Sequence, residues 1–175
     1  KANPGKLSYG TPGVGTPQHV AGELFCFLAG IKMEHIPYKG ANLNDLIAGV
    51  VQVGIQNAGA SLPMVRDGRV RGLGVTSLQR SRTLPDVPTI AEQGYPGYSS
   101  AIWSGVMAPK GTPREVISRL ESQIVASVKD RDVHQQLIHD GVRPVGGGAA
   151  DLDKLLRNEI ALWAKVIRDV GIRLV

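Results

Sequence analysis

The sequence predicts an α/β fold built on a parallel sheet. In the first hundred residues, short apolar stretches alternate with helical patterns through glycine-bearing connections. In the rest of the chain, the apolar residues recur at helical spacing. Strands that are separated by single helices pair in parallel through right-handed crossovers. We therefore expect an α/β half over residues 1–100 and a helical half over residues 101–175.

The α/β half is expected to contain four strands and three helices. The strands are expected at residues 7–10, 33–38, 50–56 and 70–76, and the helices at 17–29, 43–48 and 62–66. The helix at 17–29 has the clearest boundaries, because Thr16 can cap it, Pro17 suits its first position and Gly30 can end it. Asn42 is the expected cap of the helix at 43–48.

Beyond residue 84 the pattern changes twice. Three prolines interrupt an irregular segment at 84–98, and residues 101–108 are expected to form a further strand. From there on the apolar spacing is helical, with helices expected from 113, over 133–140 and over 151–170. The sequence Thr112-Pro113-Arg114-Glu115 is typical of a capping box. The apolar stripes of these helices need a sheet that this chain barely supplies.

Composition restricts the class of protein. The chain has 175 residues, 42% of them hydrophobic, which is typical of a globular protein. No run of apolar residues approaches the roughly 18 that a membrane helix needs. The formal net charge of +5 comes from scattered Lys and Arg residues without interleaved aromatics. We expect a solvated basic surface and no nucleic-acid partner.

A glycine-rich turn ahead of the first helix is the most informative feature of the sequence. It consists of Gly13, Val14, Gly15 and Thr16. Glycines let the backbone approach a ligand closely, and the first N–H groups of a helix are unpaired and favour anions. Thr16 stands where a P-loop needs lysine, and Gln18 stands where a dinucleotide fingerprint needs glycine. Two interpretations remain, a small-anion site and a plain capped turn.

No catalytic or metal-binding constellation is predicted. The four histidines lack metal-ligand spacing, since His134 and His139 diverge on a helix face. The single cysteine, Cys26, lies in an apolar helical stretch and is expected in the core. Ser61 lacks the glycine-flanked pattern of a hydrolase nucleophile. We expect no catalytic residues, no metal and no cofactor.

Several segments resemble, in the same order, one family of transport proteins. They read KANPGKLSYGTPGVGTPQHVAGELF, IPYKGANLNDLIAG, VQVGIQNA, VRGLGVTSLQRSRTLPDVPTIAEQGYPGY and APKGTPREVISRL. The chain resembles over its whole length the Bug family, the periplasmic substrate-binding proteins of tripartite tricarboxylate transporters. The resemblance implies a two-lobed, type II periplasmic-binding-protein-like fold that closes on its ligand.

The same resemblance implies a function in solute transport. The expected ligand is a small organic carboxylate, such as a di- or tricarboxylate, an acidic amino acid or an aromatic acid. The expected partners are the membrane subunits of a tripartite carrier, and the expected location is the periplasm. In the family, backbone amides of two glycine-bearing loops hold the carboxylate. The matching residues here are Gly13, Val14, Gly15 and Thr16, with His19 and Tyr38 as candidate wall residues.

Two departures from the family pattern affect these expectations. Gln56-Asn57 stands at the end of the third expected strand, where many relatives carry Asp followed by Asn. A neutral amide cannot compensate a buried ammonium group, so Gln56 favours ligands without one. Relatives are also longer, so residues 1–100 are expected to be one complete lobe, and residues 101–175 the helical C-terminal part of the other. We expect such a piece, taken alone, to self-associate and to bind ligand poorly.

Two alternatives to a solute receptor stay open. The type II fold also serves as the effector-binding domain of transcription regulators, which would have a DNA-binding region ahead of Lys1. A small α/β enzyme acting on a carboxylate or phosphate ester would show turnover. A signal peptide ahead of Lys1 would favour the receptor.

Overall fold

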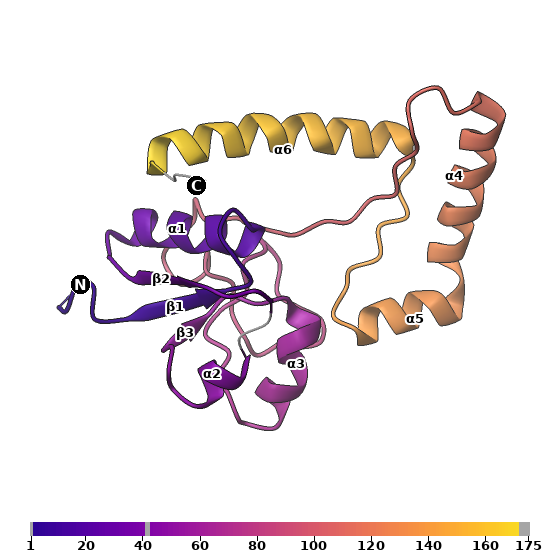
Figure 1. The fold of residues 1–175 in the computed structure, drawn as a ribbon. Helices are drawn as coiled ribbons and strands as arrows, with labels where there is room; N and C mark the ends of the chain where they lie inside the picture. The colour runs from indigo at the N-terminus through magenta and orange to yellow at the C-terminus, as the bar shows by residue number, and fades with distance from the viewer. Residues whose placement is uncertain (1, 41–42, 172–175) are drawn as a thin grey trace. The chain divides into compact units, whose positions relative to one another are not determined.

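The computed structural model describes residues 2–40 and 43–171, which form two compact units (Figure 1). One unit contains the residues up to Ile102 together with those from Val166 onward, and the other contains Trp103–Lys165. The first unit carries the sheet, and the second is helical. The expected cap Asn42 lies outside the described residues.

A three-stranded parallel sheet forms the centre of the first unit. Its strands are β1 (Ser8–Thr11), β2 (Glu34–Pro37) and β3 (Val53–Gly54), in the order β2-β1-β3. Ser8 pairs with Glu34 on one side of β1, and Tyr9 pairs with Val53 on the other. The parallel pairing confirms the predicted α/β class.

Three helices accompany this sheet. They are α1 (Pro17–Ala29), α2 (Leu43–Ile47) and α3 (Ala58–Arg66). Because β2 and β3 lie on opposite sides of β1, the chain reverses direction across the sheet after β2. Figure 1 draws α1 on one side of the strands and α2 and α3 on the other. This reversal is a topological switch point, the place where open parallel sheets usually bind ligands.

The core of the first unit lies between β1 and α1. Tyr9 of β1 is fully buried, and its ring fills the space left by Gly22 of α1. Tyr98, far along the chain, is also buried, and its hydroxyl donates to the Ala21 carbonyl oxygen over 3.1 Å. Phe25 packs edge-on against Tyr98. The segment ending at Tyr98 therefore belongs to the core that supports α1.

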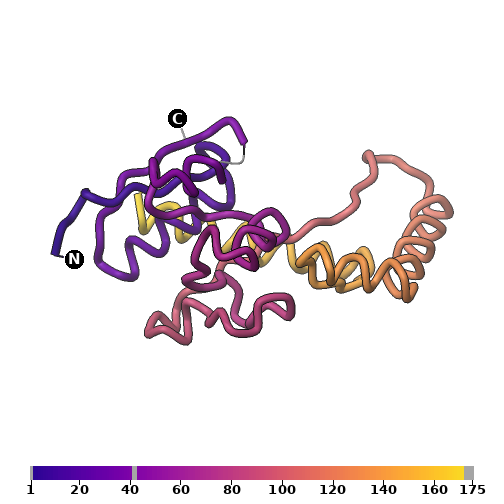
Figure 2. The backbone as a smooth tube through the Cα atoms, turned by 90° about the horizontal axis from the view of Figure 1, so that it is seen from below, coloured from indigo at the N-terminus to yellow at the C-terminus, as the bar shows by residue number. Residues whose placement is uncertain are grey.

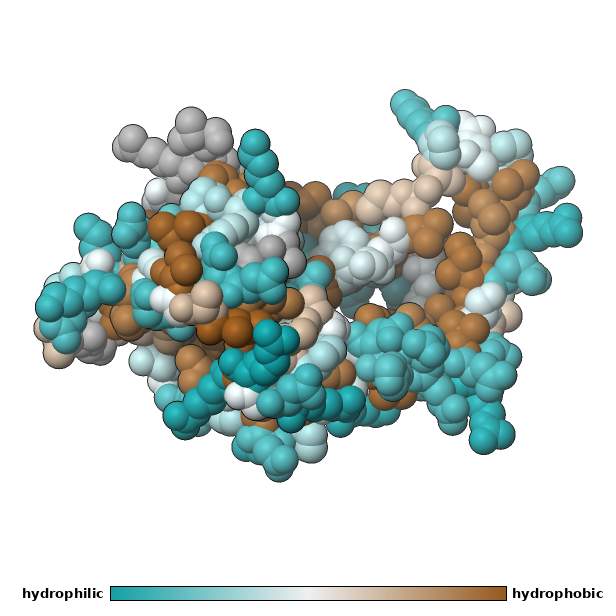
Figure 3. All heavy atoms as spheres, turned by 60° about the horizontal axis from the view of Figure 1, so that its bottom comes forward, coloured by the Kyte–Doolittle hydropathy of each residue, from teal (hydrophilic) through white to brown (hydrophobic). Residues whose placement is uncertain are grey.

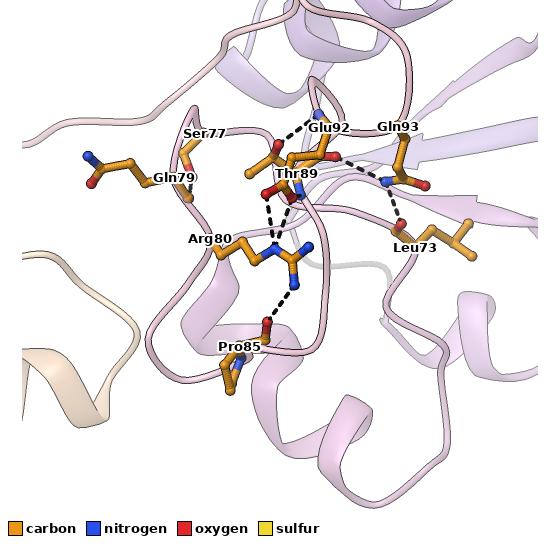
Figure 4. A network of polar contacts seen from close by, with 8 residues as sticks. All are labelled: Leu73, Ser77, Gln79, Arg80, Pro85, Thr89, Glu92 and Gln93. Atoms are coloured by element: carbon orange, nitrogen blue, oxygen red, sulfur yellow. Dashed lines mark hydrogen bonds and ion pairs between the residues drawn. The ribbon is translucent and has the colours of Figure 1, made fainter.

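A network of hydrogen bonds and one ion pair stabilises the irregular segment at residues 77–93 (Figure 4). The Glu92 carboxylate accepts from the Thr89 N–H over 2.7 Å, and the Thr89 hydroxyl accepts from the Glu92 N–H over 3.0 Å. Arg80 Nε donates to both carboxylate oxygens, and its Nη1 donates to the Pro85 carbonyl. Gln93 Nε2 donates to the Leu73 carbonyl oxygen. The Thr89 N–H and the Arg80 guanidinium lower the pKa of Glu92.

The helical unit contains α4 (Arg114–Lys129), α5 (Arg131–His139) and most of α6 (Ala149–Val170). The chain reaches α4 through an irregular stretch, drawn as an extended tube in Figure 2. The Asp130 carboxylate caps α5 by accepting from two N–H groups of its first turn. No described residue of the three helices is buried. Apolar side chains stay exposed on all three, among them Val116, Leu120, Val133 and Ile160. Figure 3 shows hydrophobic surface, in brown, on the face of the molecule in view.

Several predicted elements differ in the structure. Residues 101–108 are irregular, and of the strand predicted at 70–76 only an isolated bridge between Val75 and Thr89 forms. The third strand is confined to two residues. Strands need a continuous hydrogen-bonded neighbour, and among the described residues these stretches have only the Val75–Thr89 bridge and the short pairing of β3 with β1. The predicted capping box is also wrong, because Thr112 donates to the Pro109 carbonyl and gives α4 no side-chain cap.

Candidate functional site

The eight candidate residues lie at the carboxyl edge of the sheet or in the first turn of α1. The glycine turn (residues 13–16) follows β1, Tyr38 follows β2, and Gln56 and Asn57 follow β3. The carboxyl ends of parallel strands meet at one edge, and backbone bonds hold this edge together. The Tyr38 N–H donates to the Thr11 carbonyl over 2.9 Å, and the Ile55 N–H donates to the Gly10 carbonyl over 3.2 Å.

The Thr16 side chain fixes the start of α1. Its hydroxyl donates to the Gly13 carbonyl oxygen over 2.8 Å and accepts from the His19 N–H over 3.3 Å. Gly15 adopts a φ of 74°, in the left-handed region that favours glycine. The Thr16 hydroxyl therefore makes its hydrogen bonds within the turn and the start of α1. The groups of the turn that could bind a ligand are then its backbone N–H groups.

The backbone N–H groups of the turn fall into two sets. The Gly13 N–H donates to the Thr11 hydroxyl over 3.4 Å, and the Gly15 N–H donates to Nδ1 of His19 over 3.1 Å. The N–H groups of Val14, Thr16 and Gln18 donate to no atom of the residues that the structure describes. Val14 and Gly15 are exposed, and the first turn of α1 holds no acidic residue. Unpaired N–H groups at the positive end of a helix dipole favour an anion.

A stack of aromatic rings lies against the turn. The rings of His19 and His35 stack with centroids 3.9 Å apart and planes at 10°, and the ring of Tyr9 also stacks against His35, with centroids 4.9 Å apart. His35 Nε2 lies 2.7 Å from the Thr11 hydroxyl, which donates to the Gly13 carbonyl over 3.2 Å. Burial is the main cause that lowers the pKa of both histidines. The rings are therefore neutral near pH 7, and His19 is a buried neighbour of the turn.

Tyr38 and Asn57 are engaged with neighbouring elements. The Tyr38 hydroxyl donates to Asp45 Oδ2 over 2.8 Å, and this bond raises the pKa of Tyr38. The Asn57 Oδ1 accepts from Nε2 of Gln18 over 2.9 Å, which links α1 to the segment after β3. Gln56 is half-buried beside Asn57.

Four residues that shape this edge are not predicted from the sequence: Thr11, Gln18, Glu23 and His35. Glu23 lies four residues after His19, a spacing at which helical side chains meet, and its Oε1 lies 4.0 Å from His19 Nε2. This spacing can be read from the sequence and predicts the contact between His19 and Glu23. Thr11 and His35 meet only through the register of β1 and β2, and Gln18 meets Asn57 across the fold.

The described residues offer no centre for metal chemistry. No group of three or more His, Cys, Asp or Glu side chains within residues 2–40 and 43–171 is placed to hold a metal ion. The thiol of Cys26 is buried, which raises its pKa and lowers its reactivity. In the same part of the chain, no helix combines the length and apolar character that crossing a membrane requires.

A protein-family model matches almost the whole chain. This model, described as "Tripartite tricarboxylate transporter family receptor", matches residues 1–172. The chain belongs to this receptor family. It is 41% identical over 170 residues to the UPF0065 protein of the tcbD-tcbE intergenic region in Pseudomonas sp. (strain P51), and 36% identical over 176 residues to BugT of Bordetella pertussis. These alignments cover 95% and 99% of this chain but only 51% and 54% of the relatives.

Solved structures of similar proteins have the same fold. Rpa4515 of R. palustris with adipate superposes with a TM-score of 0.91 at 38% identity, covering 98% of this chain and 58% of that one. MatC of Rhodopseudomonas palustris with bound malate superposes with a TM-score of 0.80 at 27% identity, covering 93% and 57%. The fold is thus that of the receptor family, and this chain spans about half the length of the relatives it matches.

Proposed function

We propose that this chain functions as an extracytoplasmic solute receptor that binds a small carboxylate and delivers it to a secondary transporter. The N–H groups of Val14, Thr16 and Gln18, which donate to none of the described residues, carry this proposal, because they form an anion-binding edge in a member of a tricarboxylate receptor family. Similar receptors contain adipate and malate, which are both dicarboxylates.

The glycine turn binds one carboxylate group of the ligand. Its oxygens accept from the Val14 and Thr16 N–H groups, in charge-assisted hydrogen bonds that contribute roughly 1.5–3 kcal/mol each before desolvation. The Thr16 hydroxyl, through its bond to the Gly13 carbonyl, and the His19 ring, through its bond to the Gly15 N–H, hold the backbone of the turn in place. Tyr38, Gln56 and Asn57 line the neighbouring positions of the same edge.

Gln56 selects against ligands that carry an ammonium group. A neutral amide cannot balance a buried positive charge, so adipate is expected to bind more tightly than glutamate. We expect Gln56→Asp to reverse this order by improving glutamate binding. Calorimetry with both ligands on both proteins checks the prediction, and tight glutamate binding that is unchanged in Gln56→Ala would contradict it.

The receptor acts through closure of two lobes. Residues 1–100 form one lobe, and residues 101–175 belong to the other. Ligand binds more tightly to the closed form, so binding shifts the equilibrium toward closure. The closed form then meets the membrane subunits of a tripartite carrier in the periplasm. Because apolar side chains are exposed on α4, α5 and α6, the 175 residues are expected to self-associate and to elute on a sizing column with a larger apparent mass than a single copy.

The receptor binds its ligand without converting it. The family match favours this function over the effector domain of a transcription regulator. A carboxylate that is recovered unchanged after prolonged incubation with the protein supports simple binding. Turnover that is lost in a point variant at the turn would instead support an enzyme.

A thermal-shift panel of mono-, di- and tricarboxylates on the protein as its gene encodes it tests the proposal. At least one dicarboxylate is expected to raise the melting temperature. Gly15→Ala is expected to reduce the shift strongly, because alanine strains the left-handed backbone at this position.

Thr16→Ala is expected to weaken binding through loss of the cap, whereas Thr16→Ser retains the hydroxyl and binds like the natural protein. Thr112→Ala is the matched control, because the Thr112 hydroxyl donates to the Pro109 carbonyl in the helical unit but, unlike that of Thr16, caps no helix. If Gly15→Ala and Thr16→Ala leave every shift unchanged, the turn is not the site.

A further inference from the structure

One hydrogen bond joins the glycine turn to an ionisable ring. The Gly15 N–H donates to Nδ1 of His19 over 3.1 Å. A backbone N–H can donate only to an unprotonated nitrogen, so the neutral His19 ring carries its proton on Nε2. Protonation at Nδ1 would make this nitrogen a donor that faces the Gly15 N–H, which is also a donor, so the hydrogen bond would break. The position of the Gly15 amide therefore depends on the charge state of His19.

Burial and the neighbouring His35 ring disfavour a positive charge on His19, and one carboxylate favours it. The ring is 7% exposed and stacks against His35 at 3.9 Å, so a charge on one ring opposes a charge on the other. The opposing influence is Glu23 of α1, whose Oε1 lies 4.0 Å from Nε2. The Tyr9 hydroxyl of β1 donates to the same Glu23 oxygen. Burial outweighs Glu23, and the pKa of His19 lies below the ordinary histidine value.

His35 connects the same turn from the other end. Its Nε2 lies 2.7 Å from the Thr11 hydroxyl, which donates to the Gly13 carbonyl over 3.2 Å. The two stacked rings therefore reach both Gly13 and Gly15, on either side of Val14, whose N–H donates to none of the described residues. A change in the charge of the pair acts on the peptide groups that orient this N–H.

We propose that His19 is a positioning residue which holds the glycine turn in its ligand-binding shape, and that protonation of its ring in mildly acidic solution releases the turn. The step is a single proton transfer from solvent to Nδ1, with loss of the Gly15 hydrogen bond. The consequence for ligand affinity rests on the proposed carboxylate site, whereas the coupling between His19 and the Gly15 amide does not.

Nuclear magnetic resonance of the ¹⁵N-labelled protein without ligand tests the coupling itself. At neutral pH the His19 ring is expected to show an unprotonated Nδ1 and a protonated Nε2. As the pH is lowered, the Gly15 amide signal should move with the same midpoint as the His19 ring, below the midpoint of a histidine in an unstructured peptide. A Gly15 signal that stays fixed while His19 titrates would overturn the proposal, as would a neutral ring protonated on Nδ1.

A matched variant separates the hydrogen bond from the charge. In His19→Asn, Oδ1 takes the place of Nδ1 as acceptor but does not titrate, so the Gly15 amide should keep its neutral-pH position throughout the series. His139→Asn is the control, because its side chain is 74% exposed on α5. A Gly15 titration that persists in His19→Asn would overturn the proposal.

Calorimetry with adipate tests the functional consequence. Affinity is expected to fall about tenfold more in the natural protein than in His19→Asn as the pH passes through the His19 midpoint. The comparison cancels the ionisation of adipate, which both proteins experience equally. If adipate binds neither protein while Gly15 still follows His19, the carboxylate site is wrong and the coupling stands. Equal pH dependence in both proteins would overturn the functional part.

Discussion

Nε2 of Gln18 donates to Oδ1 of Asn57 over 2.9 Å, and this bond joins the start of α1 to the segment that follows β3. Gln18 is buried, and the Asn57 side chain makes no capping bond to α3. The pair therefore holds together two parts of the candidate site that lie 39 residues apart in sequence. It links the first turn of α1 to the residue that follows Gln56.

A double-mutant cycle measures this connection. Gln18→Ala and Asn57→Ala should each lower the free energy of unfolding, and their coupling should be about 0.5–1.5 kcal/mol, the net value of one hydrogen bond. Urea unfolding of the two single variants and the double variant gives the coupling. Strict additivity of the two substitutions would show that the bond contributes nothing.

At Gly22, α1 approaches the side chain of Tyr9 in β1 closely. A Cβ there would overlap the buried Tyr9 ring and lie 2.9 Å from Ile55 Cδ1. We predict that Gly22→Ala lowers the free energy of unfolding by about 1–3 kcal/mol, the usual cost of overpacking. Gly97→Ala is the matched control, because its Cβ would meet no atom within 4 Å. Equal melting temperatures of the two variants would contradict the packing described for α1.

The network at residues 77–93 separates a buried backbone contact from an exposed ion pair. Glu92→Ala leaves the N–H of the buried Thr89 without its acceptor, whereas Arg80→Ala removes an ion pair whose side chains are about half exposed. Exposed ion pairs contribute little, so Glu92→Ala should destabilise the protein more than Arg80→Ala does. Urea unfolding compares them. A larger effect of Arg80→Ala would show that the guanidinium, and not the Thr89 bond, anchors the segment.

Stability should fall as the pH drops through the histidine range. Burial lowers the pKa of His19 and His35, so the unfolded chain takes up protons at a higher pH than the folded protein does. The free energy of unfolding therefore decreases from about pH 7.5 downward and levels off, for these two groups, below their folded pKa values. Chemical unfolding at a series of pH values checks this. A stability that rises on acidification over this range would contradict the neutral, buried state of the rings.

Local signals in the sequence predict the parts of the fold that depend on neighbouring residues. Thr16, Pro17 and Gly30 define α1, which begins and ends where they predict. The alternation of strands and helices predicts the parallel sheet. Strands at 70–76 and 101–108 were predicted wrongly because a strand exists only with a partner, and single-sequence patterns do not contain that partner.

The candidate site shows the same division. The glycine turn is readable because a turn, its cap and its helix are continuous in sequence. The contact between Thr11 and His35, which supports the turn, depends on the register between β1 and β2. The bond from Gln18 to Asn57 depends on a contact between residues far apart in sequence. The ligand-binding role of all eight candidate residues stays a prediction.

Amide chemical-shift mapping with adipate tests the central claim most directly. On titration into the ¹⁵N-labelled protein, the Val14, Thr16 and Gln18 amide signals should move most and saturate at the affinity that calorimetry gives. Saturable binding that leaves these three signals in place, or no response to any carboxylate of the panel, would contradict the assignment of the glycine turn as the carboxylate site.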